Sequence, residues 1–560
     1  MDEPAAFLCP AFLIEGGPHR FVTQVERALW HLGFSDVRNI DGSGDAGGDI
    51  LALKRRERWA IQCKWKKKGP DGAIDLSGVE EADEARRFYG CERAMIVTNA
   101  KLSSAAQKRV DELNKLGVVT DVLDASRLAG LSTMLPDFVR QQIDLRDYQR
   151  TAADRINAKL SRDGRALLIL ATGLGKTVVG GTVIGEHLDA DPSSNVLVVA
   201  HMKDLVAQLE KAIWWHVPKQ VATHLLTGDH RPKRLDGVVC ATVESALGAV
   251  QHGYRPDLVM VDETHHLAPD GMFFELLDEL DGARQFGVTA TPWRGDKYDI
   301  EAHFGPAVYR LGIAEGMKRG FLAQVDYRLM LDNLDHDVIR DASLYGYSIK
   351  ELNRRLFLPE RDEEVASEFL KAWNGVDKPR AIVFCETIEH AERFTNLLRS
   401  LNPDWSTAAC LHAGMPKRER DLVLAEFRRG DVKVLCAVDV LNEGIDVPDV
   451  NLIAFLRVTH SRRIFVQQLG RGLRLRKGKK NVVVLDFVSD LRRIAEVLDL
   501  KRNLEGETET LEHIGHPTQI TFTNPGVQSF MEEWILDAAD LATANDDVKL
   551  NYPDPFGQVP

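Results

Sequence analysis

The segment Ala166–Thr177 reads ALLILATGLGKT, and it decides the fold of the region around it. An apolar run of strand length leads into a loop with two glycines, and a stretch rich in valine and glycine follows. In parallel α/β domains, phosphate-binding loops lie at such junctions, between a buried strand and the N-terminus of a helix. The segment therefore predicts a nucleotide-binding domain built on a parallel sheet.

The loop itself has the residue types that phosphate binding needs. Glycines allow the backbone to approach phosphate oxygens, a lysine reaches the terminal phosphates, and a threonine hydroxyl can bind Mg²⁺. The tripeptide GKT alone is weak evidence, and Leu170 stands where this pattern usually has a glycine. The predicted ATP ligands are Thr172, Gly173, Leu174, Gly175, Lys176 and Thr177.

A second motif supports the nucleotide site. VMVDETHH, residues 259–266, again ends an apolar run. Asp262 is predicted to bind Mg²⁺, and Glu263 to orient and deprotonate the attacking water, as phosphoryl transfer requires. Two carboxylates after a strand could also form a solvated turn. Because they follow the phosphate loop by about ninety residues, we favour the catalytic interpretation.

Alternating apolar and charged segments predict the rest of the α/β organisation. Two series of strand-length apolar runs, each separated by helix-like segments, indicate two parallel sheets in tandem. The runs are Ala166–Ala171, Val196–Ala200, Val238–Ala241, Leu258–Val261 and Gln285–Thr289, and then Arg380–Cys385, Val432–Ala437, Asn451–Leu456 and Asn481–Phe487. The first 136 residues have their own helix and strand pattern, which predicts a separate domain.

Composition sets the broad class. The 560 residues are 44 % hydrophobic and 28 % charged, which is typical of a globular protein with about three to four domains. A net charge of -13 argues against nucleic-acid binding by bulk charge, so local basic runs such as residues 54–68 would have to carry it. The seven cysteines are far apart and contain no CxxC pair, so we expect them to be reduced. We expect no membrane segment and a cytoplasmic location.

The order of motifs resembles that of superfamily-two helicases and translocases of the DEXH type. LRDYQ (145–149), ATGLGKT, AHMKDLVAQ (200–208), CATVES (240–245), DETHH and TATP (289–292) precede IVFCET (382–387), VDVLNEGIDVP (438–448) and QQLGRGLR (467–474). The resemblance implies two tandem RecA-like domains that bind ATP and Mg²⁺. It also implies that Tyr148 and Gln149 contact adenine, that Asp446 lies near the nucleotide, and that Thr242, Asn442 and Gly444 lie near the nucleic-acid backbone.

Gln467, Arg471 and Arg474 would act from the second helicase domain. The resemblance implies that these residues face the nucleotide, where arginines stabilise the charge of the transition state when the cleft closes. The alternative is a basic surface turn continuous with residues 476–480. DETHH, TATPWRGD and NEGIDVP are closer to type I and type III restriction motors than to DEAD-box RNA helicases. This similarity implies duplex DNA rather than RNA as the partner.

A second set of chemical residues lies near the N-terminus, in GDAGGDILALKRRERWAIQCKWKK (44–67). Gln62 and Lys64 are two positions apart on a predicted strand, so both project to one face and can lie beside Asp49. Asp49 and Gln62 are predicted to hold Mg²⁺ while Lys64 assists the attacking water, which suits phosphodiester hydrolysis. Lys66 and Lys67 are predicted to contact nucleic acid.

This arrangement resembles the Mrr-like restriction endonuclease domains of the PD-(D/E)XK group, including the later segment MIVTNAKLSSAA (95–106). In that family a glutamate often follows the phenylalanine of the first helix, whereas Val22 stands here. Glu26, one turn later, could serve as a substitute carboxylate near the metal or could be a solvated helix residue. Because Gln62 is a neutral ligand, a domain that binds DNA without cutting it remains an alternative.

The predicted fold is an α/β protein in which a restriction-endonuclease-like domain precedes two RecA-like domains. The expected boundaries are 1–136 for the endonuclease domain, 137–326 and 362–490 for the helicase domains, 327–361 for a linker, and 491–560 for a C-terminal extension. We favour an ATP-driven DNA translocase that is also a Mg²⁺-dependent endonuclease and that acts in restriction of foreign DNA. Other subunits of the same defence system are its expected protein partners. The alternatives are a repair or remodelling helicase with a DNA-docking domain, and a nucleic-acid-triggered ATPase switch that acts through partners.

Overall fold

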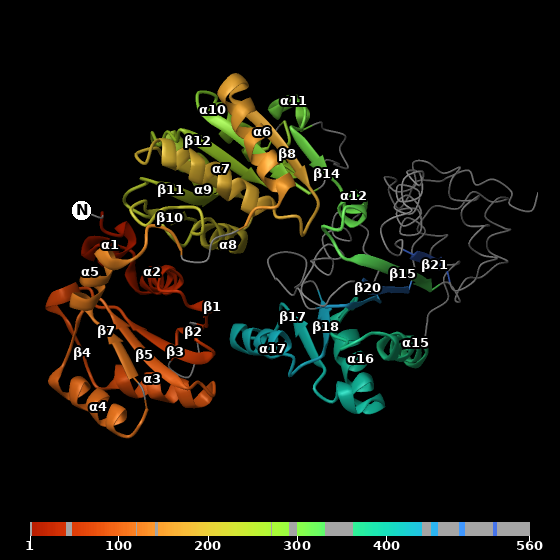
Figure 1. Ribbon diagram of the computed structural model, residues 1–560, viewed down its shortest axis with the longest axis horizontal. Helices are drawn as coiled ribbons and strands as arrows, with labels where there is room; N and C mark the ends of the chain where they lie inside the picture. Colours follow the sequence, from red (N-terminus) through yellow and green to blue (C-terminus); the bar gives the residue numbers. More distant parts are fainter. Residues whose placement is uncertain are drawn as a thin grey trace, which may run out of the picture. The chain divides into compact units, whose positions relative to one another are not determined.

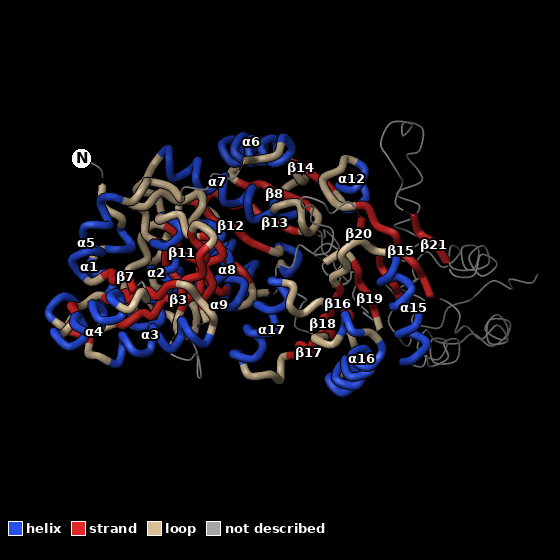
Figure 2. The backbone as a smooth tube through the Cα atoms, turned by 60° about the horizontal axis from the view of Figure 1, so that its bottom comes forward, coloured by secondary structure: helices blue, strands red, loops and turns tan. Residues whose placement is uncertain are grey.

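The computed structural model describes residues 3–40, 48–118, 120–139, 144–269, 271–290, 300–330, 362–438, 450–456, 481–487 and 519–522. The chain divides into two compact units, one of residues 1–169 and 175–310 and one of residues 170–174 and 311–560. The first unit contains the N-terminal domain and the sheet that follows it, and the second contains the last large sheet. Each of the three large sheets is accompanied by helices (Figures 1 and 2).

The N-terminal domain is built on a five-stranded sheet in the order β1-β2-β3-β5-β7. Its strands are β1 (Ser35–Asn39), β2 (Ile50–Lys54), β3 (Glu57–Lys64), β5 (Arg93–Thr98) and β7 (Thr120–Leu123). The first three pair antiparallel, and β3, β5 and β7 pair parallel. A small parallel pair, β4 (Ala73–Ile74) and β6 (Lys101–Leu102), lies beside them.

Helices lie on both faces of this sheet (Figure 1). Alternating side chains of its strands pack into two separate hydrophobic clusters, one on each face. Ile61 and Cys63 of β3 face the core under helix α2 (Gly17–His31), whereas Ala60 packs with Ala85 of helix α3 (Ser77–Phe88). Gln62 and Lys64 therefore lie on the α3 face, because strand side chains alternate. The helices are η1 (Ala6–Leu8), α1 (Pro10–Glu15), α2 (Gly17–His31), η2 (Gly69–Asp71), α3 (Ser77–Phe88), α4 (Ser104–Lys115) and α5 (Ala125–Met134).

The second sheet has seven strands in the order β10-β11-β9-β12-β13-β8-β14. They are β8 (Arg165–Leu170), β9 (Val196–Ala200), β10 (Thr223–Leu226), β11 (Val238–Thr242), β12 (Leu258–Asp262), β13 (Arg284–Thr289) and β14 (Tyr309–Leu311). The helices are α6 (Asp147–Asp163), α7 (Lys176–Ala190), α8 (Lys203–Ile213), α9 (Val243–Gln251), η3 (Thr264–His266), α10 (Met272–Glu279), α11 (Glu301–Phe304) and α12 (Ile313–Lys318). Because β8 to β13 pair parallel, their carboxyl ends lie along one edge, where the motif residues follow.

The third sheet also has seven strands, in the order β17-β18-β16-β19-β20-β15-β21. They are β15 (Gln324–Met330), β16 (Ala381–Phe384), β17 (Ala409–His412), β18 (Val434–Val438), β19 (Leu452–Phe455), β20 (Asn481–Phe487) and β21 (Gln519–Phe522). The helices described beside them are α15 (Asp362–Gly375), α16 (Ile388–Leu401), η4 (Pro403–Trp405) and α17 (Lys417–Arg429). Every strand pairing of this sheet that is described is parallel.

The α/β class and the tandem parallel sheets predicted from the sequence are confirmed. Two strands of the third sheet lie outside the residue range expected for the second helicase domain. β15 crosses the expected boundary between residues 326 and 327, because its residues pair with β20 rather than forming a linker. β21 lies in the expected C-terminal extension but pairs with β15. The seven cysteines are free thiols, as expected, and five of them are buried.

Candidate functional site

The phosphate-binding loop requires glycine for two reasons. Gly173 and Gly175 have φ angles of +89° and +86°, a left-handed conformation that side chains rarely adopt. A Cβ atom on Gly175 would also lie only 2.4 Å from Nε2 of Gln149. Helix α7 begins at Lys176, directly after the loop, so its free N–H groups point to the position where phosphate binds in such loops.

Tyr148 and Gln149, the predicted adenine contacts, lie in the first turn of α6. Both are buried, and burial raises the pKa of the Tyr148 hydroxyl. Gln149 Oε1 accepts a hydrogen bond from the backbone N–H of Arg146 at 3.0 Å, which fixes its side chain at the helix start. The structure thus brings Gln149 against Gly175 of the phosphate loop.

The DETHH motif at the end of β12 forms a compact charged cluster with Lys176. Lys176 Nζ donates to Glu263 Oε1 at 2.6 Å. Burial opposes ionisation of Glu263, but Lys176 and His265 outweigh it and lower the pKa of this carboxyl. Glu263 has a left-handed φ of +52°, a conformation that is costly for glutamate and is often found at functional sites.

Asp262 differs sharply from its neighbour. Its side chain is buried, and Oδ1 has no hydrogen-bond partner among the described residues. Burial and the adjacent charge of Glu263 raise the pKa of Asp262 to about 7. A buried carboxylate oxygen without a donor suits a divalent cation, which would satisfy the oxygen and lower the pKa. Thr177, the other predicted magnesium ligand, lies in the first turn of α7, half-buried beside Lys176.

Three histidines that the sequence analysis did not assign connect neighbouring motifs. His265 Nδ1 lies 3.1 Å from Thr289 Oγ1 at the end of β13. The ring centroids of His201 and His266 are 4.0 Å apart, and those of His265 and His266 are 4.5 Å apart. The signal was present in the sequence, because all of them follow predicted parallel strands that end at one edge of the sheet.

Of the residues predicted to contact nucleic acid in the helicase core, only Thr242 is described. It is buried at the N-terminus of α9, and its hydroxyl donates to Ser245 Oγ at 3.0 Å. The side chain is therefore engaged within its own turn. Six other predicted site residues lie outside the described residues: Asn442, Gly444, Asp446, Gln467, Arg471 and Arg474.

In the N-terminal domain, the structure brings Asp49 and Gln62 together. β2 and β3 pair with Ile50 opposite Ile61, which places Asp49 beside Gln62. Asp49 Oδ2 accepts a hydrogen bond from the Cys63 N–H at 2.5 Å, so its carboxylate is fixed toward β3. Gln62 is 4 % exposed, and its Oε1 has no partner among the described residues. A carboxylate and an unsatisfied amide oxygen fit a Mg²⁺ ion.

Lys64 is on the same face of β3 but has a partner that sequence reasoning missed. Its ammonium group forms an ion pair with Glu81 of α3, and both side chains are partly exposed. No spacing rule links a strand residue to that helix position, so only the packing of α3 on β3 reveals the pair. The described residues contain no group of three or more histidine, cysteine or acidic side chains that could hold a metal ion.

Glu26 is not a solvated helix residue, so this alternative is wrong. Its side chain is 1 % exposed, and Oε1 accepts a hydrogen bond from Lys211 Nζ of α8 at 2.7 Å. Burial outweighs the effect of Lys211 and raises the pKa of Glu26. Val22, which stands at the usual glutamate position of the Mrr-like pattern, packs in the core of the domain.

The two lysines predicted to contact DNA follow β3. The backbone of Lys66 is held by Asn99, whose Oδ1 accepts from Lys66 N at 2.8 Å and whose Nδ2 donates to Lys66 O at 3.0 Å. Lys67 is exposed to solvent. The turn is thus rigid at one lysine and leaves the next accessible.

Comparisons with known proteins identify three domains in order along the chain. The family described as "Restriction endonuclease" matches residues 15–131, "Type III restriction enzyme, res subunit" matches 142–294, and "Helicase conserved C-terminal domain" matches 362–476. These ranges contain the clusters around Asp49 and around Lys176. Among the described residues, no helix is both long and apolar enough to cross a membrane.

Individual relatives are distant. The putative mitochondrial ATP-dependent helicase irc3 of Schizosaccharomyces pombe is 26 % identical over 432 residues, which are 74 % of this chain and 69 % of the relative. The type I restriction enzyme EcoAI endonuclease subunit of Escherichia coli is 27 % identical over 378 residues, 61 % of this chain and 46 % of that protein. This chain thus spans about half the length of that relative.

A solved structure supports the fold. The ATP-dependent Type ISP restriction-modification enzyme LlaBIII, bound to DNA, aligns with a TM-score of 0.53 and 19 % identity over 93 % of this chain and 41 % of that one. At this identity the similarity concerns the fold alone.

Proposed function

We propose that this chain, a superfamily-two helicase core joined to an Mrr-type restriction endonuclease domain, is an ATP-driven DNA translocase that cuts DNA in restriction of foreign DNA. One observation carries the proposal. The Lys176–Glu263–Asp262 cluster and the Asp49–Gln62 cluster, each suited to phosphate chemistry, belong to the same compact unit of one chain.

The motor chemistry follows from the first cluster. Lys176 would neutralise the terminal phosphates of ATP, and Glu263, kept ionised by Lys176 and His265, would orient and deprotonate the water. Thr177 and Asp262 would hold Mg²⁺, which supplies charge neutralisation at the phosphates. Tyr148 and Gln149 would contact the adenine.

The second helicase domain would complete the ATP site and contact the nucleic acid. Arg471, Arg474 and Gln467 would approach the γ-phosphate, and Asp446 would lie near the nucleotide. Asn442 and Gly444, with Thr242 of the first domain, would lie near the nucleic-acid backbone. These assignments rest on the sequence motifs that contain the residues.

In the endonuclease domain, Asp49 and Gln62 would bind Mg²⁺ through their oxygens, and Lys64 would position the attacking water. The bound cation supplies stabilisation of the charge that develops on the cleaved phosphate. Lys64 must leave or share its ion pair with Glu81 to do so. Lys66 and Lys67 would bind the DNA backbone.

We infer that the protein acts on duplex DNA in the cytoplasm. Another subunit of the same defence system would distinguish self DNA from foreign DNA. A relative is a type I restriction endonuclease subunit, and the family matched by residues 142–294 is described as a res subunit. Both descriptions support a restriction role.

The second candidate is a repair or remodelling helicase whose N-terminal domain binds DNA without cutting it. Two observations favour it: Gln62 makes one metal ligand neutral, and Glu26, the available substitute carboxylate, binds Lys211 instead. The relative irc3 is described as an ATP-dependent helicase, which agrees with the helicase part of this candidate.

The deciding experiment is plasmid cleavage by the purified protein in Mg²⁺, with and without ATP, beside Lys64→Ala and Lys176→Ala. Cutting by the wild type that is lost in Lys64→Ala supports the endonuclease, and its loss in Lys176→Ala would indicate that the motor controls cutting. DNA-stimulated ATP hydrolysis without any cutting would favour the second candidate.

A further inference from the structure

Helix α2 of the endonuclease domain buries both of its faces. Phe21, Val22, Val25 and Leu29 pack into the core of their own domain. The polar residues on the other side are buried as well, each less than a tenth exposed: Arg20, Gln24, Glu26, Arg27 and His31. Charged side chains are rarely buried without partners, so the contacts of this face are informative.

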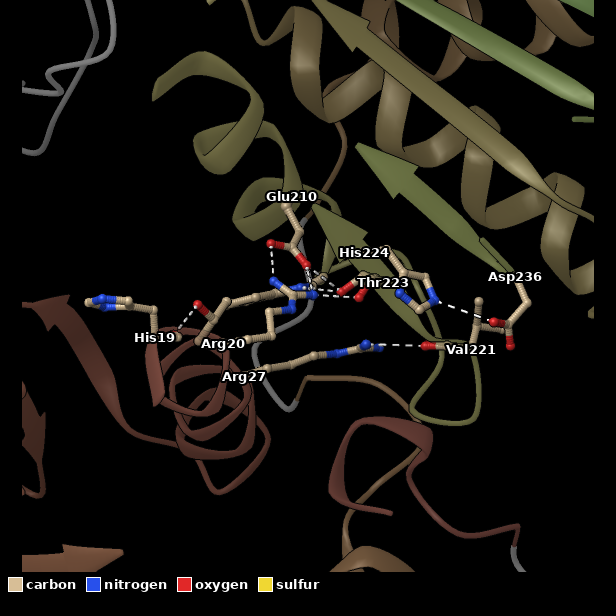
Figure 3. A network of polar contacts seen from close by, with 10 residues as sticks. His19, Arg20, Arg27, Glu210, Val221, Thr223, His224 and Asp236 are labelled. Atoms are coloured by element: carbon tan, nitrogen blue, oxygen red, sulfur yellow. Dashed lines mark hydrogen bonds and ion pairs between the residues drawn. The ribbon is translucent and has the colours of Figure 1, made fainter. Parts of the chain in front are cut away.

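The first helicase domain supplies those partners (Figure 3). Arg20 forms a two-pronged ion pair with Glu210 of α8, in which Nη1 donates to Oε2 at 2.8 Å. Glu210 is 0 % exposed and also accepts from Thr223 Oγ1 at 2.7 Å, so both of its oxygens are satisfied. These contacts keep the pKa of Glu210 low although burial opposes its ionisation.

Arg27 binds the backbone between α8 and β10. Its Nη1 donates to the carbonyl of Val221 and its Nη2 to the carbonyl of Pro218, both at 3.1 Å. The guanidinium also lies over the ring of Phe7, 4.3 Å from its centroid. Burial of Arg27 lowers its pKa to about 9.

A second ion pair and two hydrogen bonds to backbone carbonyls extend the contact between the two domains. Lys211, next to Glu210 on α8, donates to Glu26 at 2.7 Å. Lys219, 1 % exposed, donates through Nζ to the carbonyl of Leu135 at 2.6 Å and through its backbone N–H to the carbonyl of Asp137 at 2.7 Å. The chain segment that connects the two domains is therefore held at its start.

Helix α8 links the contact between the two domains to a helicase motif. It begins at Lys203, inside the helicase-like motif 200–208, and it ends at Ile213, just after Glu210 and Lys211. One rigid helix thus runs from a motif of the helicase core to the buried charges of α2. A helix is a stiff connection because its backbone hydrogen bonds fix every turn.

We propose that α2 and α8 form a fixed joint. Arg20, Glu26, Glu210 and Lys211 are positioning residues that hold the endonuclease domain and the first helicase domain as one body and make DNA cutting depend on the motor. The dependence of cutting on the motor rests on the proposed function, whereas the joint itself does not.

The test uses Lys211→Glu in the full chain. Lys211 is 38 % exposed, so the introduced carboxylate can be accommodated, but it would face the buried Glu26. The matched control is Lys371→Glu on α15, which also reverses the charge of a lysine paired with a glutamate. Adding Glu26→Gln to Lys211→Glu should restore the contact, because the introduced amide can donate to the introduced carboxylate.

Two readouts separate the joint from the activity. By differential scanning calorimetry, the wild type and Lys371→Glu should unfold their endonuclease and first helicase domains in one transition. Lys211→Glu should give a separate transition for the endonuclease domain, and the double variant should restore the single one. In plasmid cleavage, Lys211→Glu should lose the difference between reactions with and without ATP, while DNA-stimulated ATP hydrolysis stays at the wild-type level.

A single transition in Lys211→Glu together with unchanged ATP dependence would overturn the proposal. If Lys211→Glu does not fold, Glu26→Gln alone applies the same two readouts, because it removes one charge of the pair and keeps its shape. Absence of cutting in the wild type under all conditions would contradict the proposed function, and the calorimetric result would still decide whether the joint exists.

Discussion

Lys176 Nζ donates to Glu263 Oε1 at 2.6 Å, although the two residues lie 87 positions apart in the chain. One stands at the start of α7 and the other follows β12, so the parallel sheet brings them to the same edge. Lys176 helps to lower the pKa of Glu263. The lysine proposed to bind phosphate and the glutamate proposed to activate water therefore lie in direct contact.

Lys176→Ala should abolish DNA-stimulated ATP hydrolysis, by on the order of a hundredfold or more, because it removes charge stabilisation from the phosphates. The pKa of Glu263 should also rise, since Lys176 holds it low. Phosphate release with and without DNA measures the loss. Lys159→Ala, which removes a surface ion pair with Asp163, is the control and should hydrolyse ATP normally.

Gly175→Ala should weaken ATP binding much more than it weakens the fold. The new Cβ would displace Gln149, which lies 2.4 Å away, from its place beside the nucleotide loop. Gly164→Ala is a matched control, because Gly164 also has a positive φ, +72°, but nothing lies within 4 Å of the added Cβ. Both changes should cost about 1 kcal/mol of stability from backbone strain. Equal ATP affinities in the two variants would contradict the assignment of Gln149.

The sequence predicted those parts of the fold that buried strands encode. Continuous apolar runs identified β8, β9, β11, β12 and β13 nearly to the residue, because strands buried on both faces tolerate few polar side chains. Strands that are short or contain many polar residues were not predicted. β15 and β21 contain alternating polar residues, and their pairing partners are distant in the chain, so no local pattern marks them as members of the last sheet.

Some contacts of the two candidate sites could be predicted from the sequence and others could not, for a related reason. Asp49 and Gln62 could be placed together because strand geometry fixes their spacing. The ion pair of Lys64 with Glu81 and the joint of Arg20 with Glu210 could not, because they depend on how elements pack in space. Polar residues on a helix predict a solvated face, and only the structure reveals a second domain against that face.

Asp49→Asn should abolish Mg²⁺-dependent DNA cutting and leave DNA-stimulated ATP hydrolysis intact. The amide can keep an oxygen toward the Cys63 N–H, so the strand ends should hold their geometry, but the charge that attracts a cation is lost. Plasmid nicking and linearisation measure the effect. Asp75→Asn, at an exposed turn before α3, is the control. Cutting that survives Asp49→Asn would mean that the metal is bound elsewhere.

His31 lies at the joint and predicts how the stability of the first unit depends on pH. The ring is 0 % exposed, and its Nδ1–H donates to the carbonyl of Pro136 at 3.1 Å. Burial, and secondarily the charge of Arg27, lower the pKa of His31 to about 3. The folded protein thus holds the neutral ring, while the unfolded chain binds a proton below its ordinary pKa of about 6.5.

Because only the unfolded chain binds this proton between pH 6.5 and 3, the contribution of His31 to the free energy of unfolding is fully present above pH 6.5. That contribution decreases as the pH falls toward 3. Between pH 7.5 and 5.5, His31 should reduce the free energy of unfolding by on the order of 1 kcal/mol. His31→Gln can still donate to the Pro136 carbonyl but carries no titrating group, so it should remove that part of the pH dependence. Denaturant unfolding of both proteins at the two pH values measures the difference. His252→Gln, at the exposed end of α9, is the control, and an equal reduction of pH dependence in both variants would show that the buried position of His31 is not the cause.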